Sequence, residues 1–202
     1  MIKDAFSIVI PAYKTDDLLR KLLNELFRQK EEFPQTQIVV VDDGSGMYWL
    51  DELDVKAIHR ENGGEAAARN TGLKNAEGEY LAWVDSDDMV VSDYLRTIYA
   101  AARKGYDFEM YRWRCSNGVK GYQWKESRLW NHNVWSYTYK RKLITEWFDE
   151  RRNYAPDFDW LVRQVRPEWS LLYVDKEIVI YNESRPDSLT NLYNRGEISL
   201  WK

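Results

Sequence analysis

The sequence is poor in cysteine, in long apolar runs and in excess positive charge, and each shortage excludes a class of protein. Cys115 is the one cysteine among 202 residues, so an internal disulfide and a zinc site built from cysteines are both excluded. No run of about 18 apolar residues occurs, so we expect no transmembrane span. The net charge of −4 disfavours a general nucleic-acid binder with a broad basic surface.

The composition is that of a soluble globular protein, long enough for one domain with a substantial core. Its first residues, Met1 to Asp4, lack the apolar core of a signal peptide. We therefore expect a cytoplasmic protein, and contact with the inner face of a membrane stays open. Ten tryptophans and fourteen tyrosines are unusually many. Their rings stack on sugars and bases or simply fill a core.

The hydrophobic pattern of the first half predicts alternating strands and helices. The expected strands span residues 6–10, 38–41, 55–59 and 80–84. The expected helices begin near Asp16, at Glu65 and at Ser92, and they end near residues 27, 76 and 102. This order predicts an α/β fold with a mostly parallel central sheet and helices on both faces.

Beyond residue 105 the pattern is weaker. Phe108–Arg114 alternates as a strand does, whereas residues 128–147 show no clean period. A short helix is expected at 157–165, two strands at 171–174 and 178–181, and a loop from Asn182 onward. No linker or internal repeat divides the chain, so we expect a single domain over residues 1–202.

Two of the expected strands run directly into acidic turns. Asp42 and Asp43 follow one strand, and Asp85, Asp87 and Asp88 follow another. Crowded carboxylates repel one another unless a cation lies between them. Mg²⁺ or Mn²⁺ is commonly held by one or two carboxylates, with phosphates completing the coordination. The sequence therefore favours a metal and nucleotide site at the carboxyl edge of the sheet, the alternative being two Asp-rich surface turns.

Four segments in order resemble family 2 glycosyltransferases. They are Ser7-Ile8-Val9-Ile10-Pro11-Ala12-Tyr13, Val41-Asp42-Asp43-Gly44-Ser45, Asn62-Gly63-Gly64 with Ala68-Arg69-Asn70-Thr71-Gly72-Leu73, and Gly78-Glu79-Tyr80 with Asp85-Ser86-Asp87-Asp88. The resemblance implies a GT-A fold and a nucleotide-diphosphate sugar donor, most simply a UDP-sugar. It further implies Mn²⁺ or Mg²⁺, and inverting transfer to a hydroxyl of a glycan or a lipid-linked acceptor.

The resemblance also implies roles for single residues of the first half. The nucleoside pocket would be lined by Pro11, Ala12 and Tyr13. Asp43 would accept a hydrogen bond from the uracil ring with Asp42 beside it, and Arg69 would approach the nucleotide or its phosphates.

In the same way, Asp87 would be the direct metal ligand. Asp85 would contact the ribose and the metal shell, and Asp88 would support the metal site or contact the acceptor. Residues 1–105 would thus bind nucleotide and metal, and residues 106–202 would bind the acceptor.

In the second half, the segment around Pro156 and Asp157 resembles the family loop that carries the general base. Asp157 matches the base, and Pro156 replaces the usual glutamate. The alternatives are that Asp157 is only a helix cap, or that Asp159 is the base. Trp135 and His132 are further candidates for contact with acceptor, phosphate or metal.

Two other functions remain open. One is a catalytically silent module that binds a nucleotide sugar, which the short chain and Pro156 would suit. The other is a nucleotidyltransferase of similar fold, but the chain has no glycine-rich basic phosphate loop after its first strand.

Overall fold

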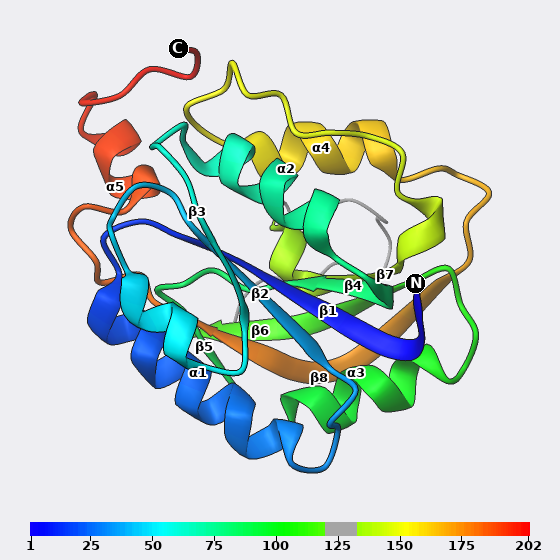
Figure 1. Ribbon diagram of the computed structural model, residues 1–202. Helices are drawn as coiled ribbons and strands as arrows, with labels where there is room; N and C mark the ends of the chain where they lie inside the picture. Colours follow the sequence, from blue (N-terminus) through cyan, green and yellow to red (C-terminus); the bar gives the residue numbers. More distant parts are fainter. Residues whose placement is uncertain (120–132) are drawn as a thin grey trace.

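The computed structural model describes residues 1–119 and 133–202 as one eight-stranded sheet with helices packed on both faces (Figure 1). The strand order is β3-β2-β1-β4-β7-β6-β8-β5. The strands are β1 (Ile2–Ala12), β2 (Gln37–Asp42), β3 (Lys56–His59), β4 (Gly78–Trp83), β5 (Met89–Val90), β6 (Phe108–Cys115), β7 (Tyr137–Lys140) and β8 (Leu171–Tyr181). The helices are α1 (Asp16–Lys30), α2 (Glu65–Asn75), α3 (Tyr94–Ala102), α4 (Pro156–Gln164) and α5 (Leu189–Asn194), with short 3₁₀ turns at Tyr48–Glu52, Val134–Ser136 and Arg141–Leu143.

The predicted parallel sheet is confirmed in the block β3-β2-β1-β4, whose neighbouring strands are all parallel. The remaining strands form a mixed half, because β7 runs antiparallel to both β4 and β6 while β8 runs parallel to β6. The Ile38–Val41 run of β2 is wholly buried. A continuous apolar strand of this kind requires cover on both faces of the sheet, which the helices supply.

Helices α1 and α3 cover one face of the sheet, and α2 and α4 cover the other (Figure 1). Helix α1 buries one apolar stripe, formed by Leu19, Leu22, Leu23 and Leu26. Helix α2 lies very close to β1, because a Cβ atom added at Gly72 would meet Val9 Cγ1 at 2.2 Å. Gly72 therefore sets how near α2 approaches the sheet, and α2 carries a residue of the candidate site.

Two predictions for the second half, those for residues 171–181 and for the tail, were wrong. Residues 171–181 form one strand rather than two, because β8 pairs with β6 on both sides of its exposed polar centre. Strand β7 lies within the stretch that shows no period. The tail contains α5, where the Ser188 side chain accepts a hydrogen bond from the backbone N–H of Asn191.

The carboxyl ends of β1, β2 and β4 meet at one edge of the sheet, as their parallel register requires. The segment after β8 reaches the same edge, where the Asn182 backbone N–H donates to Asp88. Within residues 1–119 and 133–202, no helix is long and apolar enough to cross a membrane.

Candidate active site at the carboxyl edge of the sheet

Asp42, directly at the end of β2, organises the turn that follows the strand. Its carboxylate accepts hydrogen bonds from the backbone N–H groups of Ser45 (2.7 Å) and Met47 (2.8 Å) and contacts His59 Nδ1 (3.0 Å). Burial opposes ionisation of this carboxyl, but His59 and the two N–H groups outweigh it and lower the pKa of Asp42. Asp42 therefore shapes the turn in which Asp43 lies.

Asp43 joins that turn to the loop before α2. Its buried carboxylate accepts from the backbone N–H groups of Gly63 (3.1 Å) and Gly64 (2.8 Å), and Arg60 donates a further hydrogen bond to it. Gly44 follows in the left-handed region at φ 88°, which a larger residue adopts only with strain.

The expected nucleoside residues lie beside this turn. Ala12 is paired with Asp42 across the strands, and the Asp43 backbone N–H donates to the Ala12 carbonyl (2.9 Å). Pro11 is buried next to Ala12, while the Tyr13 ring is exposed. The structure thus places Pro11, Ala12, Tyr13 and Asp43 side by side.

Arg69, from α2, is fully buried at the centre of the site and faces three carboxylates. Its guanidinium contacts Glu65 Oε1 at 2.6 Å, Asp85 Oδ1 at 2.8 Å and Asp157 Oδ1 at 3.1 Å. These partners outweigh burial and raise the pKa of Arg69, so it remains charged. Because it is buried and already paired, Arg69 is placed to position Asp85 and Asp157.

Asp157 lies in the first turn of α4, as expected, and its buried side chain contacts Arg69. The Val134 backbone N–H donates to its Oδ2 at 3.2 Å. Burial, helped by the charges of Glu65 and Asp85 and opposed by Arg69, raises the pKa of Asp157 to about 8. A carboxyl with such a pKa can take up a proton near neutral pH, which is what a general base requires.

Asp87 and Asp88 face the segment that follows β8. Arg185 Nη1 donates to Asp87 Oδ2 at 3.0 Å, and the Asn182 backbone N–H donates to Asp88 Oδ1 at 2.8 Å. Asp88 Oδ2 is buried and has no hydrogen-bond partner among the described residues. Burial and the neighbouring charge of Asp85 raise the pKa of both carboxyls. Negative charge at this turn is therefore only partly balanced.

This donor set suits a divalent cation that also binds a phosphate ligand. In the described part of the chain, no three His, Cys, Asp or Glu side chains could hold a metal by themselves. Asp85 and Asp87 each keep part of their surface open, with 25% and 20% of the side chain exposed. Two open carboxylates with phosphate oxygens form a normal shell for Mg²⁺, so the residues fit the expected metal.

The remaining candidates are Asp159, Trp135 and His132. Asp159 points away to form ion pairs with Arg163 (2.8 Å) and Arg152 (3.2 Å), so its geometry favours Asp157 as the base. Trp135 is buried, with its ring stacked on Tyr181 at a centroid distance of 5.9 Å. His132 lies outside the described residues.

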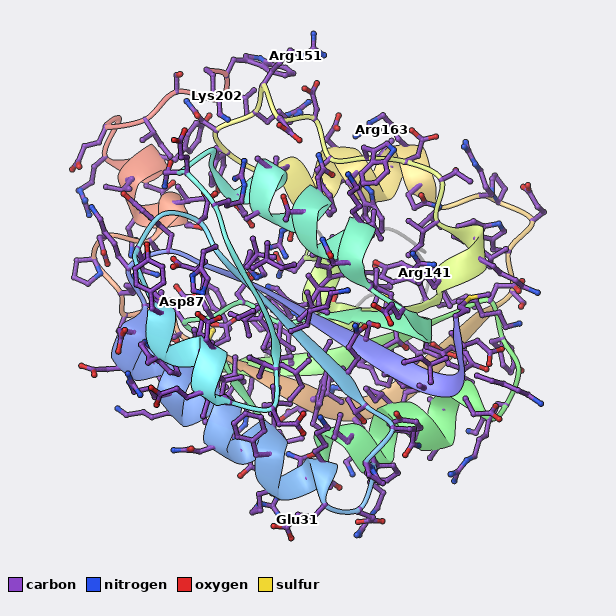
Figure 2. All side chains as sticks on the ribbon, viewed as in Figure 1. Glu31, Asp87, Arg141, Arg151, Arg163 and Lys202 are labelled. Carbon is purple, nitrogen blue, oxygen red and sulfur yellow. The ribbon has the colours of Figure 1, made fainter. Side chains whose placement is uncertain are left out.

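Sequence reasoning missed two residues of the site. Glu65 lies four residues before Arg69 on α2, a spacing that predicts a helical ion pair. Arg185 lies in the segment between β8 and α5 and contacts both Asp87 and Asp187. Nothing in the sequence links Arg185 to Asp87, which is 98 residues away. Figure 2 shows Asp87 near the strand ends at which these segments meet.

Comparison with known proteins places most of the chain in one family. Residues 7–166 match the family profile described as glycosyl transferase family 2. The chain is 37% identical over 107 residues to the glycosyltransferase GlyA of Streptococcus pneumoniae, a match covering 49% of this chain and 15% of GlyA. It is 27% identical over 219 residues to the uncharacterized glycosyltransferase EpsJ of Bacillus subtilis, covering 92% of this chain and 63% of EpsJ. The matches thus span less than two thirds of these relatives.

A solved structure extends this likeness to the fold. The crystal structure of residues 1–349 of TarS from Staphylococcus aureus superposes with a TM-score of 0.77 at 25% identity, covering 88% of this chain and 60% of that one. The same fragment in complex with UDP-GlcNAc gives a TM-score of 0.78 over 92% of this chain and 60% of that one, at 23% identity. TarS is a poly(ribitol-phosphate) β-N-acetylglucosaminyltransferase.

Proposed function

The chain belongs to glycosyl transferase family 2 and has the GT-A fold, and on this basis we propose that it is an inverting, metal-dependent glycosyltransferase. The donor is a nucleotide-diphosphate sugar, most simply a UDP-sugar, and the acceptor is a hydroxyl. One observation carries the proposal above the others. The buried guanidinium of Arg69 joins Asp85, at the expected metal site, to Asp157, the expected base.

The donor assignment is supported by the turn at Asp43. Pro11, Ala12, Tyr13 and Asp43 lie together where the ends of parallel strands meet, which is where open α/β sheets bind nucleotides. Because TarS has been solved in complex with UDP-GlcNAc, a uridine donor is the natural first candidate.

The transfer needs a base for the acceptor and a stabilised leaving group. Asp157 in its ionised form takes the proton of the acceptor hydroxyl as the oxygen attacks the anomeric carbon, and the nucleoside diphosphate leaves. Arg69 keeps the Asp157 carboxylate in place. Asp85 and Asp87 would hold the cation, which would supply positive charge to offset the negative charge that the leaving diphosphate gains.

The two halves of the chain divide this work. Residues 1–105 supply Asp43, Asp85 and Asp87 and bind donor and metal, while residues 106–202 supply Asp157 and bind the acceptor. We propose a glycan acceptor. Since TarS acts on poly(ribitol-phosphate), one specific form of this acceptor would have a polyol-phosphate backbone.

Donor hydrolysis without acceptor tests the proposal. A panel of nucleotide sugars is incubated with the protein and Mn²⁺, and the released nucleotide is measured. We expect slow release of UDP from at least one UDP-sugar. Binding without any release would favour a silent module, and release of pyrophosphate would favour a nucleotidyltransferase.

A further inference from the structure

Glu65 is a carboxylate of the candidate site that has no role in the reaction described above. It is the first residue of α2, and 24% of its side chain is exposed. Its Oε1 accepts both hydrogen bonds that Arg69 donates to it, from Nη2 (2.6 Å) and from Nε (3.1 Å). Among the described residues, no hydrogen bond reaches Oε2, the other oxygen of this carboxylate. Oε2 can therefore accept a hydrogen bond from a ligand.

Contacts of a single nitrogen place Glu65 next to both chemical ends of the site. Arg69 Nη2, which bonds Glu65, also donates to Asp85 Oδ1 at 2.8 Å. Asp157 Oδ2 lies 3.5 Å from the same nitrogen. Asp85 belongs to the expected metal site and Asp157 is the expected base, and 25% and 13% of their side chains are exposed. A sugar ring that contacts both of these carboxylates therefore lies beside Glu65.

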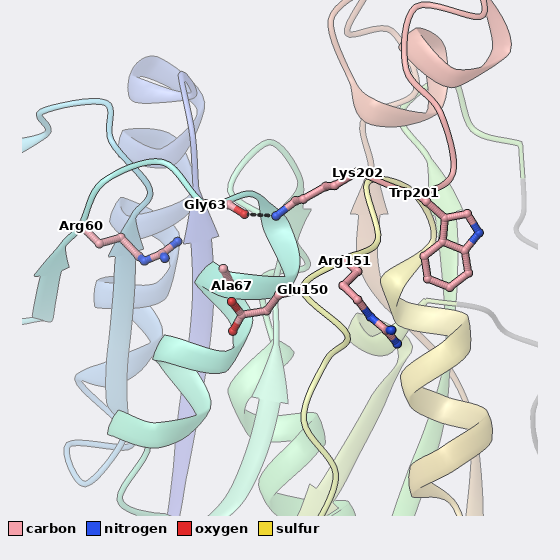
Figure 3. A pocket seen from close by; sticks show the side chains of 7 residues that line it. All are labelled: Arg60, Gly63, Ala67, Glu150, Arg151, Trp201 and Lys202. Atoms are coloured by element: carbon pink, nitrogen blue, oxygen red, sulfur yellow. Dashed lines mark hydrogen bonds between the residues drawn. The ribbon is translucent and has the colours of Figure 1, made fainter.

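The loop before Glu65 connects it to the expected nucleoside site. The backbone N–H of Gly64 donates to Asp43 Oδ2 at 2.8 Å, and that of Gly63 donates to Asp43 Oδ1 at 3.1 Å. Lys202 Nζ donates to the Gly63 carbonyl, beside a pocket that both residues line (Figure 3). Glu65 directly follows this segment, so the fold fixes its position relative to Asp43.

We propose that Glu65 accepts a hydrogen bond from a hydroxyl group of the transferred sugar and thereby helps to select the donor. The inference rests on the proposed function, because it adds a contact to the same site. In that reaction the anomeric carbon lies between the acceptor oxygen at Asp157 and the diphosphate at Asp85. Glu65 lies beside this position, and a carboxylate is a strong acceptor for hydroxyl groups. The ligand class is a neutral sugar, because a uronic acid would bring a further negative charge toward these carboxylates.

The test compares the affinity for UDP-sugars with the affinity for UDP, measured by calorimetry with Mn²⁺. UDP-glucose, UDP-galactose and UDP-N-acetylglucosamine are the neutral probes, and UDP-glucuronic acid is the charged one. Glu65→Gln keeps a side-chain carbonyl oxygen for Arg69 but replaces Oε2 by an amide group. We expect this variant to bind UDP normally and to bind the best neutral UDP-sugar about fivefold to tenfold more weakly, because a hydrogen bond to a charged acceptor becomes at most a neutral one.

Glu61→Gln is the matched control. Glu61 is exposed on the same loop, so this variant removes the same charge and should leave every affinity unchanged. If Glu65→Gln weakens UDP and UDP-sugars by the same factor, Glu65 only supports Arg69 and the proposal is overturned. An unchanged affinity for every neutral UDP-sugar overturns it as well. Tighter binding of UDP-glucuronic acid than of the neutral probes by the unaltered protein would contradict the assignment to a neutral sugar.

The titration with UDP alone separates failure of this proposal from failure of the proposed function. UDP binding together with a UDP-sugar affinity that does not depend on Glu65 rejects the role of Glu65 alone. No binding of UDP or of any UDP-sugar by the unaltered protein rejects the proposed uridine donor and, with it, the role of Glu65.

Discussion

Replacing Asp157 by Asn should slow sugar transfer by a factor of about 10²–10⁴, the usual contribution of a general base. The change preserves shape, and Arg69 keeps its contacts with Glu65 (2.6 Å) and Asp85 (2.8 Å), so the cluster should remain assembled. The factor corresponds to about 3–5 kcal/mol of transition-state stabilisation. UDP affinity should change little, because Asp157 is expected to contact the acceptor.

The assay measures UDP release with and without acceptor across a pH series. As the proposed base, Asp157 would act in its ionised form, and because its pKa is raised to about 8, the rate should climb as pH rises toward 8. Asp157→Asn should lose this climb. Asp159→Asn is the matched control: it removes ion pairs with Arg152 and Arg163 but no group at the site. Near-normal transfer by Asp157→Asn would refute the reasoning, and loss of transfer in Asp159→Asn alone would move the base by two residues.

Three further predictions concern metal binding and stability. Asp87→Ala should markedly weaken metal-dependent UDP affinity in calorimetry, because the cation would lose the direct ligand that we propose for it; unchanged affinity would exclude Asp87 from the metal site. Burial raises the pKa of Glu109 to about 7 from 4.5. The free energy of unfolding should therefore fall by about 3 kcal/mol as pH rises between these values. Glu109→Gln should abolish that fall in thermal unfolding. The hydrogen bond that the His59 ring donates to Asp42 raises the pKa of His59 above 6.5, so the stabilisation from this pair is present below pH 6.5 and is lost as pH rises above it. His59→Gln should flatten this part of the curve of unfolding free energy against pH, and an unchanged slope would contradict the role of His59.

The first half was predictable because its elements carry regular patterns. The apolar run Ile38–Val41 and the apolar stripe of α1 each predict a buried face, and both are buried in the structure. The expected strands and helices occur within a few residues of their predicted ends. The acidic turns were predictable for the same reason, since parallel strands must end at one edge.

The second half was less predictable because tertiary contacts determine it. Helix α5 has six residues and no buried face of its own, and it is held in part by the Tyr193 ring stacked on Tyr154 at 4.0 Å. The contact between Arg185 and Asp87 likewise depends on how β8 returns to the site. Arg69 was expected at the nucleotide, and its complete burial between three carboxylates emerges only when α2 and α4 are packed together.

The most direct test of the central claim is calorimetric titration of the protein with UDP, in the presence and absence of Mn²⁺. If the acidic turns form a site for metal and nucleotide, UDP should bind with Mn²⁺ and bind far more weakly without it. Equal affinity with and without Mn²⁺ would contradict the metal site. No binding of UDP under either condition would contradict the uridine donor.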